Sequence, residues 1–163
     1  MPDLLPDGSM VAPMTVVNPT NGRTAIAVAR IDTGDDIALI DPSVANTLAL
    51  VANGQTTVEG VSGQPVVTPL YLVDINLGAS GYASNVQVAG FPGLARVMGI
   101  TLLAGDDLLN RGVLVRDGPG GFWSFTTAGG VAVPPGPNWW AIGAAVAGIG
   151  GGVALWHGLR RGR

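Results

Sequence analysis

The sequence predicts an all-β body followed by a single membrane-spanning helix. Glycine (26) and proline (12) are abundant among the 163 residues, and they separate many short apolar runs, which is typical of strands joined by turns. Near the C-terminus, 18 uncharged residues run from Trp139 to Trp156, close to the ~20 that span a bilayer. We therefore expect a β-domain with a lipid anchor over residues 139–159.

The composition leaves carboxylates as the acid–base groups of the β-domain. The chain has a formal net charge of -3 and no basic cluster before its last residues, so nucleic acid is not expected as a partner. It contains no cysteine and a single histidine, His157. These absences exclude thiolate metal sites, and they leave no histidine in the body of the chain for a zinc site or a serine-type triad. We expect no metal and no cofactor.

Short apolar runs between turn residues define the elements of the β-domain, residues 14–127. A flexible N-terminal arm is expected over residues 1–13, which carry three prolines and no apolar run. Asp41 followed by Pro42 is typical of a helix start. Helical turns are predicted over residues 41–50 and 106–110, and strands over residues 14–17, 24–31, 37–40, 55–61, 64–67, 69–77, 82–89, 100–103, 112–115 and 121–126.

The C-terminal residues divide into a linker, a membrane helix and a tail. Residues 128–138 are rich in glycine and proline and predict a semi-stiff linker. Tryptophans at both ends of the apolar run fit the two membrane interfaces, and residues 160–163 form a basic tail. The alternative is a buried core helix rich in glycine and alanine, but glycine costs up to ~1 kcal/mol in a helix exposed to water. The pattern favours a single-pass membrane helix.

Two orientations of this anchor stay open. The positive-inside rule places the basic tail in the cytoplasm and the β-domain on the other side. Residues 1–13, however, lack the basic start and the apolar core of a secretory signal. The favoured expectation is a C-terminal anchor with the β-domain in the cytoplasm.

The candidate functional residues begin where the strand over residues 24–31 ends. There an apolar run leads into Asp32, Thr33 and Gly34, and a second apolar run follows at residues 37–40. A carboxylate at the end of a buried strand is costly unless neighbouring groups hold it. Threonine and glycine suit a tight turn that orients a carboxylate and hydrogen-bonds it. The pattern predicts a carboxylate held in a fixed direction.

A second segment, residues 100–115, makes this pattern more specific. It contains an apolar strand, a turn at Gly105, and then Asp107, Leu108 and Leu109 at the start of a short helix. Together with the Asp-Thr-Gly triplet, the order and spacing of these residues resemble the retropepsin-like aspartic proteases, the single-domain relatives of the retroviral proteases. The resemblance covers the whole β-domain, and it implies an acid-protease half-barrel with one short C-terminal helix.

The resemblance assigns roles to individual residues of this sequence. Asp32 matches the catalytic aspartate, Thr33 its buried hydroxyl neighbour and Gly34 the turn glycine. The residues expected to pack beneath the site are Leu103, Ala104 and Gly105. The hairpin of residues 55–67 is expected to form a mobile flap, whose tip residues are Val61, Ser62, Gly63 and Gln64. Residues 115–122 resemble the closing hairpin of bacterial members.

Two departures from the family pattern concern charge. Asp35 stands where the family usually has alanine or serine, next to the expected substrate contacts. Asp36 and Asp106 stand where the viral members pair an acid with an arginine, and two carboxylates disfavour a close approach. Arg30 and Arg111 are the candidates to compensate this charge.

The resemblance implies an endopeptidase that works on peptide or protein substrates as a homodimer. Hydrolysis by this route needs two carboxylates that share a proton around one water, and one chain supplies only Asp32. The spacing of Gly148 and Gly152 in the membrane helix allows close helix approach and favours pairing. Two alternatives remain: a catalytically silent, dimeric peptide-binding or scaffold module at the membrane, and a small structural membrane protein whose β-domain merely resembles a protease.

Overall fold

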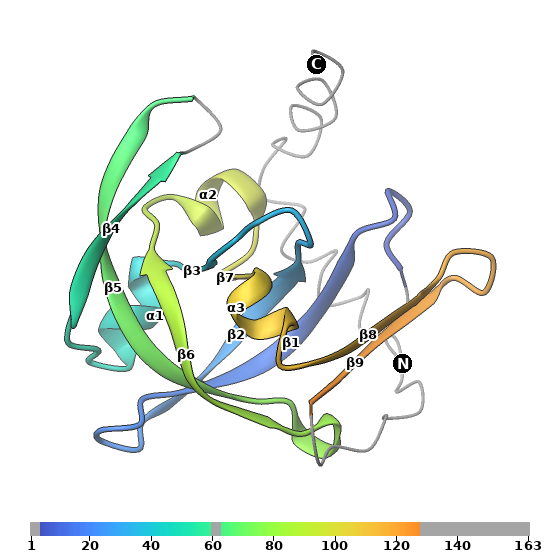
Figure 1. The fold of residues 1–163 in the computed structure, drawn as a ribbon, viewed down its shortest axis with the longest axis horizontal. Helices are drawn as coiled ribbons and strands as arrows, with labels where there is room; N and C mark the ends of the chain where they lie inside the picture. Colours follow the sequence, from blue (N-terminus) through green and yellow to red (C-terminus); the bar gives the residue numbers. More distant parts are fainter. Residues whose placement is uncertain (1–3, 60–62, 128–163) are drawn as a thin grey trace.

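The computed structural model describes residues 4–59 and 63–127, which fold into a mostly β domain (Figure 1). Its strands are β1 (Met10–Val17), β2 (Thr24–Ile31), β3 (Ala38–Ile40), β4 (Gly54–Glu59), β5 (Pro65–Asn76), β6 (Tyr82–Gly90), β7 (Leu102–Ala104), β8 (Gly112–Asp117) and β9 (Phe122–Thr127). Its helices are α1 (Pro42–Thr47), α2 (Leu94–Met98), α3 (Asp106–Leu109) and the 3-10 turn η1 (Gly78–Ser80). The predicted all-β body is confirmed.

Most of the strands close into a barrel. Their order is β1-β2-β7-β3-β6-β5, and the last residues of β5 pair back with β1, as in Val16↔Ile75. β4 pairs with the first half of β5, and the two form a hairpin that rises from the barrel in Figure 1. β8 and β9 form a separate two-stranded sheet. Closure satisfies the strand edges that an open sheet would leave exposed.

The central strand β7 lies between β2 and β3. It pairs in parallel with β2 and antiparallel with β3. The chain must therefore cross from one side of β7 to the other between Ile31 and Ala38. This crossing contains Asp32, so the sheet topology itself places the candidate catalytic turn at the end of β7.

Two apolar clusters hold the domain together. The main core fills the barrel, where Ile40, Ile75, Leu102 and Leu108 are fully buried, and each such side chain contributes about 1.5–3 kcal/mol. A smaller group, named here the second cluster, joins α2 to β3, β7 and the β4–β5 hairpin. Its members are Leu39, Ala89, Leu94, Ile100 and Leu103, with Val28, Ile37, Val58, Leu70, Phe91 and Met98 partly buried against them.

The barrel begins earlier in the chain than predicted. β1 starts at Met10, so residues 10–13 pair with β2, although the sequence places them in a flexible arm. Pro13 is tolerated in this strand because its partner Val28 donates its N–H to the Thr101 hydroxyl at 2.9 Å, away from β1. Leu4 also contacts the domain, since its N–H donates to Gly121 O at 2.8 Å.

One long strand replaces two predicted ones. β5 runs unbroken from Pro65 to Asn76 and serves both the β4 hairpin and β6. Pro69 does not end it, because the pairing with β6 begins one residue later, at Leu70. The missing N–H of Pro69 therefore removes no hydrogen bond from the ladder between β5 and β6.

α2 was not predicted from the sequence.

The predicted linker, membrane helix and basic tail, residues 128–163, lie outside the described residues. Among the residues that the structure does describe, no helix is long and apolar enough to cross a bilayer.

Candidate active site

Asp32 stands at the end of β2, in a turn that fixes its side chain. Its N–H donates to Ala104 O at 3.1 Å, which extends the pairing of β2 with β7 by one residue. One carboxylate oxygen, Oδ1, accepts the N–H of Gly34 at 3.0 Å. The Asp32 side chain is half-buried. Main-chain bonds thus fix the direction of the Asp32 carboxylate at the end of β2.

Thr33 differs from the expectation drawn from the resemblance. A buried hydroxyl was expected, but Thr33 is exposed in the single chain, as is Gly34. The reason is that the turn extends past Ile31, the last residue of β2 that pairs with β7. The hydroxyl of Thr33 is free to face a second molecule.

Gly105 makes the crossing over β7 possible. A Cβ atom at this position would lie 2.6 Å from Ile37 O and 2.7 Å from Asp35 O, closer than any ordinary contact. The loop after Asp32 therefore passes directly over the Gly105 backbone. The neighbouring Leu103 and Ala104 are buried beneath it, at 2% and 0% exposure. The end of β7 and Gly105 thus pack against the loop that follows Asp32.

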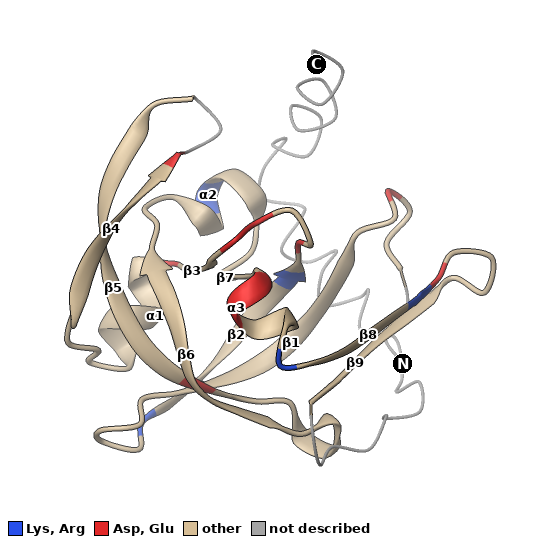
Figure 2. Cartoon of the chain, viewed as in Figure 1, with Lys and Arg blue, Asp and Glu red and all other residues tan. Residues whose placement is uncertain are grey.

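Acidic side chains gather around this turn. Figure 2 shows acids on the loop between β2 and β3 and at the start of α3. Burial raises the pKa of Asp35 to about 6, and the charges of Asp32 and Asp36 add to the effect. Among the described residues, no three acidic or histidine side chains are arranged to hold a metal ion. The charges of Asp32 and Asp36 thus favour the protonated form of Asp35.

The two candidate compensating arginines have other partners. The guanidinium of Arg111 donates to three main-chain oxygens, those of Asp107 (2.7 Å), Ser84 (2.5 Å) and Asn85 (3.0 Å). It thus ties α3 to β6. The charge of Arg30 lowers the pKa of Asp7. Burial would raise this pKa, but hydrogen bonds from Ser9 and the charge of Arg30 together outweigh burial.

The hairpin predicted over residues 55–67 is present as β4 and β5, and its role as a flap stays a prediction. Its register places Glu59 opposite Pro65. Of the expected tip residues, Gly63 and Gln64 are exposed, whereas Val61 and Ser62 lie outside the described residues. The hairpin packs into the second cluster through Val58, near its tip, and Leu70, at its base.

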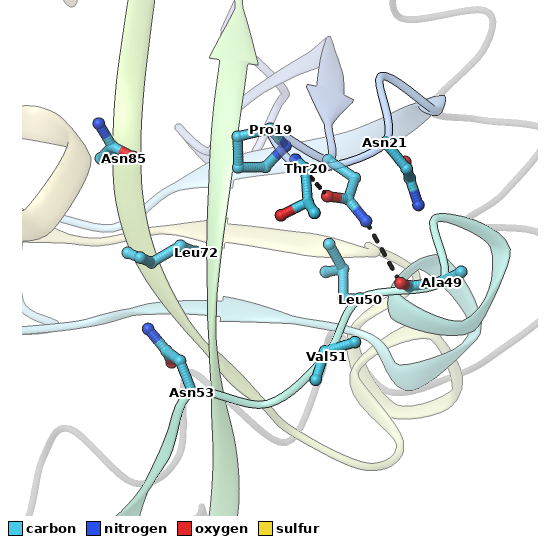
Figure 3. A pocket seen from close by; sticks show the side chains of 10 residues that line it. Pro19, Thr20, Asn21, Ala49, Leu50, Val51, Asn53, Leu72 and Asn85 are labelled. Carbon is cyan, nitrogen blue, oxygen red and sulfur yellow. Dashed lines mark hydrogen bonds between the residues drawn. The ribbon is translucent and has the colours of Figure 1, made fainter.

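A separate cavity of about 440 Å³ lies between the β1–β2 turn and the loop after α1 (Figure 3). Four asparagines line it together with apolar residues such as Leu50 and Leu72. None of its lining residues titrates, so the cavity has no group for acid–base catalysis.

Comparison with solved structures shows that the chain is similar to a retropepsin-like aspartic protease from Rickettsia conorii, known from a crystal structure. The two chains are 16% identical, the match covers 71% of this chain and 80% of that chain, and the TM-score is 0.49. No protein-family model matches the sequence, and no curated protein matches it.

Proposed function

We propose that this protein is an aspartic endopeptidase whose active site forms between two copies of the chain. The observation that supports this function most directly is the Asp32 turn. A half-buried carboxylate is held by the Gly34 N–H at the open end of a barrel, above a glycine that leaves no room for a side chain. This arrangement orients a carboxylate toward a ligand and adds nothing to the stability of a core.

The chemistry needs a second carboxylate. In peptide hydrolysis by this route, one carboxylate takes a proton from the attacking water while the other donates a hydrogen bond to the substrate carbonyl. Two carboxylates about 3 Å apart cannot both ionise, so the pair shares one proton. A two-fold axis beside the Asp32 turn supplies Asp32 from each copy. An extended peptide then lies under the β4–β5 hairpin as an added strand.

Asp35 makes the proposed pairing of two chains depend on pH. Two copies that meet at the Asp32 turn bring six carboxylates of residues 32, 35 and 36 together, and like charges oppose the approach. Because burial and neighbouring charges raise the pKa of Asp35 to about 6, this side chain holds a proton in acidic solution. The proposed dimer is therefore favoured as pH falls toward 6.

A lipid anchor over residues 139–159, with the β-domain on the cytoplasmic side, is part of the proposal. The anchor rests on an uncharged run with tryptophans at both ends, followed by arginines, and the orientation follows the expectation drawn from residues 1–13. Anchoring raises the local concentration of the chains and so favours pairing.

A peptide-library cleavage assay with the parent and Asp32→Asn tests the activity. Asn has nearly the same shape as Asp but cannot act as a base, so we expect cleavage by the parent and none by the variant. Asp117→Asn is the matched control, because it removes a carboxylate in the β8–β9 turn. Equal cleavage by the parent and Asp32→Asn would refute the proposal.

One observation favours a second candidate, a catalytically silent peptide-binding module. The family position occupied by Asp35 usually carries a small residue, and here it carries a half-buried acid. If this candidate holds, the parent cleaves no peptide, and Asp32→Asn binds the same peptides as tightly as the parent does.

A further inference from the structure

One buried carboxylate caps two helices. Asp41 is 7% exposed. Its Oδ1 accepts the N–H of Ser43 at 2.9 Å and the Ser43 hydroxyl at 2.6 Å, which caps α1. Its Oδ2 accepts the N–H of Ala95 at 3.0 Å, in the first turn of α2. Burial would raise the pKa of Asp41, but these hydrogen bonds outweigh burial and lower the pKa, so the carboxylate is charged at neutral pH.

The position of α2 depends on such outside contacts. The helix has five residues and lies between Gly93 (φ 87°) and Gly99 (φ 67°), both in the left-handed region. A helix this short has no stability of its own. Its N-cap, Gly93, has no side chain to bond the first amides, so the carboxylate of Asp41 does so from another element. α2 is therefore a short helix whose position depends on contacts with other elements, among them the carboxylate of Asp41.

α2 shares one apolar cluster with both parts of the candidate active site. Leu94 and Met98 of this helix belong to the second cluster. The same cluster contains Ile37, which follows the Asp32 turn, and Val58 and Leu70 of the β4–β5 hairpin. Figure 1 shows α2 beside the hairpin and above β3. A shift of α2 is therefore transmitted to the flap and to the turn.

We infer that Asp41 is a positioning residue, which fixes α2 as a spacer between the flap hairpin and the Asp32 turn and so sets the width of the peptide cleft. This inference rests on the proposed function, because it assigns the cleft to a peptide substrate. Asp41 contacts neither the substrate nor the reacting atoms. Its loss changes how well a peptide is held and leaves the chemistry of Asp32 intact.

The test compares Asp41→Ser with Ser43→Ala. Serine at residue 41 still caps α1, since it is a good N-cap residue, but it is too short to reach Ala95. Ser43→Ala removes one hydrogen bond from the same carboxylate and leaves the bond to Ala95. We expect Asp41→Ser to raise KM about tenfold, the size of one hydrogen bond to a charged group, with kcat and its pH profile unchanged. Ser43→Ala is expected to leave KM unchanged. Equal KM values for the two variants would overturn the inference.

Amide hydrogen exchange tests the same link without catalysis. In Asp41→Ser, the amides of residues 94–98 and of the β4–β5 hairpin are expected to exchange faster than in the parent, while those of β1 and β2 are unchanged. Faster exchange in α2 alone would contradict the coupling. If the parent cleaves no peptide, the proposed function fails, and the exchange pattern still decides whether Asp41 positions the hairpin. If Asp41→Ser does not fold, the isosteric Asp41→Asn replaces it under the same criteria.

Discussion

The main-chain N–H of Asp106 donates a hydrogen bond of 2.9 Å to the carbonyl oxygen of Asp35. This bond joins the start of α3 to the loop that follows Asp32. The bond lies beside Gly105, and the loop that follows Asp32 passes directly over the Gly105 backbone. Two distant segments of the chain thus form one unit, and the stability of the candidate site depends on their fit.

Gly105→Ala is expected to destabilise the domain by about 3 kcal/mol. The added Cβ would meet main-chain oxygens of Ile37 and Asp35, which cannot rotate away as a flexible side chain can. Urea unfolding measures the effect as a lower midpoint with an unchanged slope. Gly118→Ala is the control, because a Cβ there meets nothing within 4 Å. Similar midpoints for the two variants would show that the crossing is not tightly packed.

Asp35→Asn is expected to stabilise the domain at neutral pH. The pKa of Asp35 is raised from 3.8 to about 6, so between these values the folded chain binds more protons than the unfolded chain. Stability therefore falls as pH rises from about 4 to 6, and the loss is complete above 6. Asp35 is only half-buried and water screens its repulsion, so we expect a gain of about 1 kcal/mol at pH 7.

The same variant at low pH provides an internal control. At pH 3 Asp35 is protonated in both the folded and unfolded states, so parent and Asp35→Asn are expected to have similar free energies of unfolding. If the difference in free energy of unfolding between the parent and Asp35→Asn is constant from pH 3 to 7, the raised pKa of Asp35 is not the cause of that difference.

Asn18→Ala is expected to cost about 1–3 kcal/mol. Asn18 is 4% exposed, and its amide donates to Leu48 O (3.0 Å) and Ala49 O (3.2 Å) while its Oδ1 accepts from Thr20 N. Truncation leaves Ala49 O and Thr20 N without the Asn18 side chain, while Leu48 O still accepts from the Asn21 amide at 3.2 Å. Asn46→Ala, on the exposed side of α1, is expected to change stability by less than about 0.5 kcal/mol. Thermal or urea unfolding of both variants checks this difference.

Local signals in the sequence predicted the parts of the fold that depend on neighbouring residues. β2 has the predicted bounds, because residues 24–31 form an apolar run between turn residues. Asp41 caps α1, as expected for an aspartate that directly precedes a proline. The turn at Asp32 follows from the chemistry of the triplet, and Gly105 was identified because the resemblance requires a glycine there.

The features that sequence reasoning missed depend on contacts between distant residues. The sequence places residues 10–13 in a flexible arm and begins a strand at Pro69, but β1 includes Pro13 and β5 runs through Pro69. The bond from Ala95 to Asp41 joins residues 54 positions apart, and nothing in either segment indicates it. Arg111 was a candidate partner for acids, yet its donors bind main-chain oxygens.

The most direct test of the two-chain active site is a mixing experiment with full-length parent and Asp32→Asn. The two are equilibrated at constant total concentration, and cleavage is measured against the fraction of parent chains. If each site needs Asp32 from both copies, activity follows the square of that fraction, so an equal mixture retains about one quarter of the parent's activity. Activity that falls linearly, to about one half, would show that each Asp32 works independently of the other copy and would contradict the account.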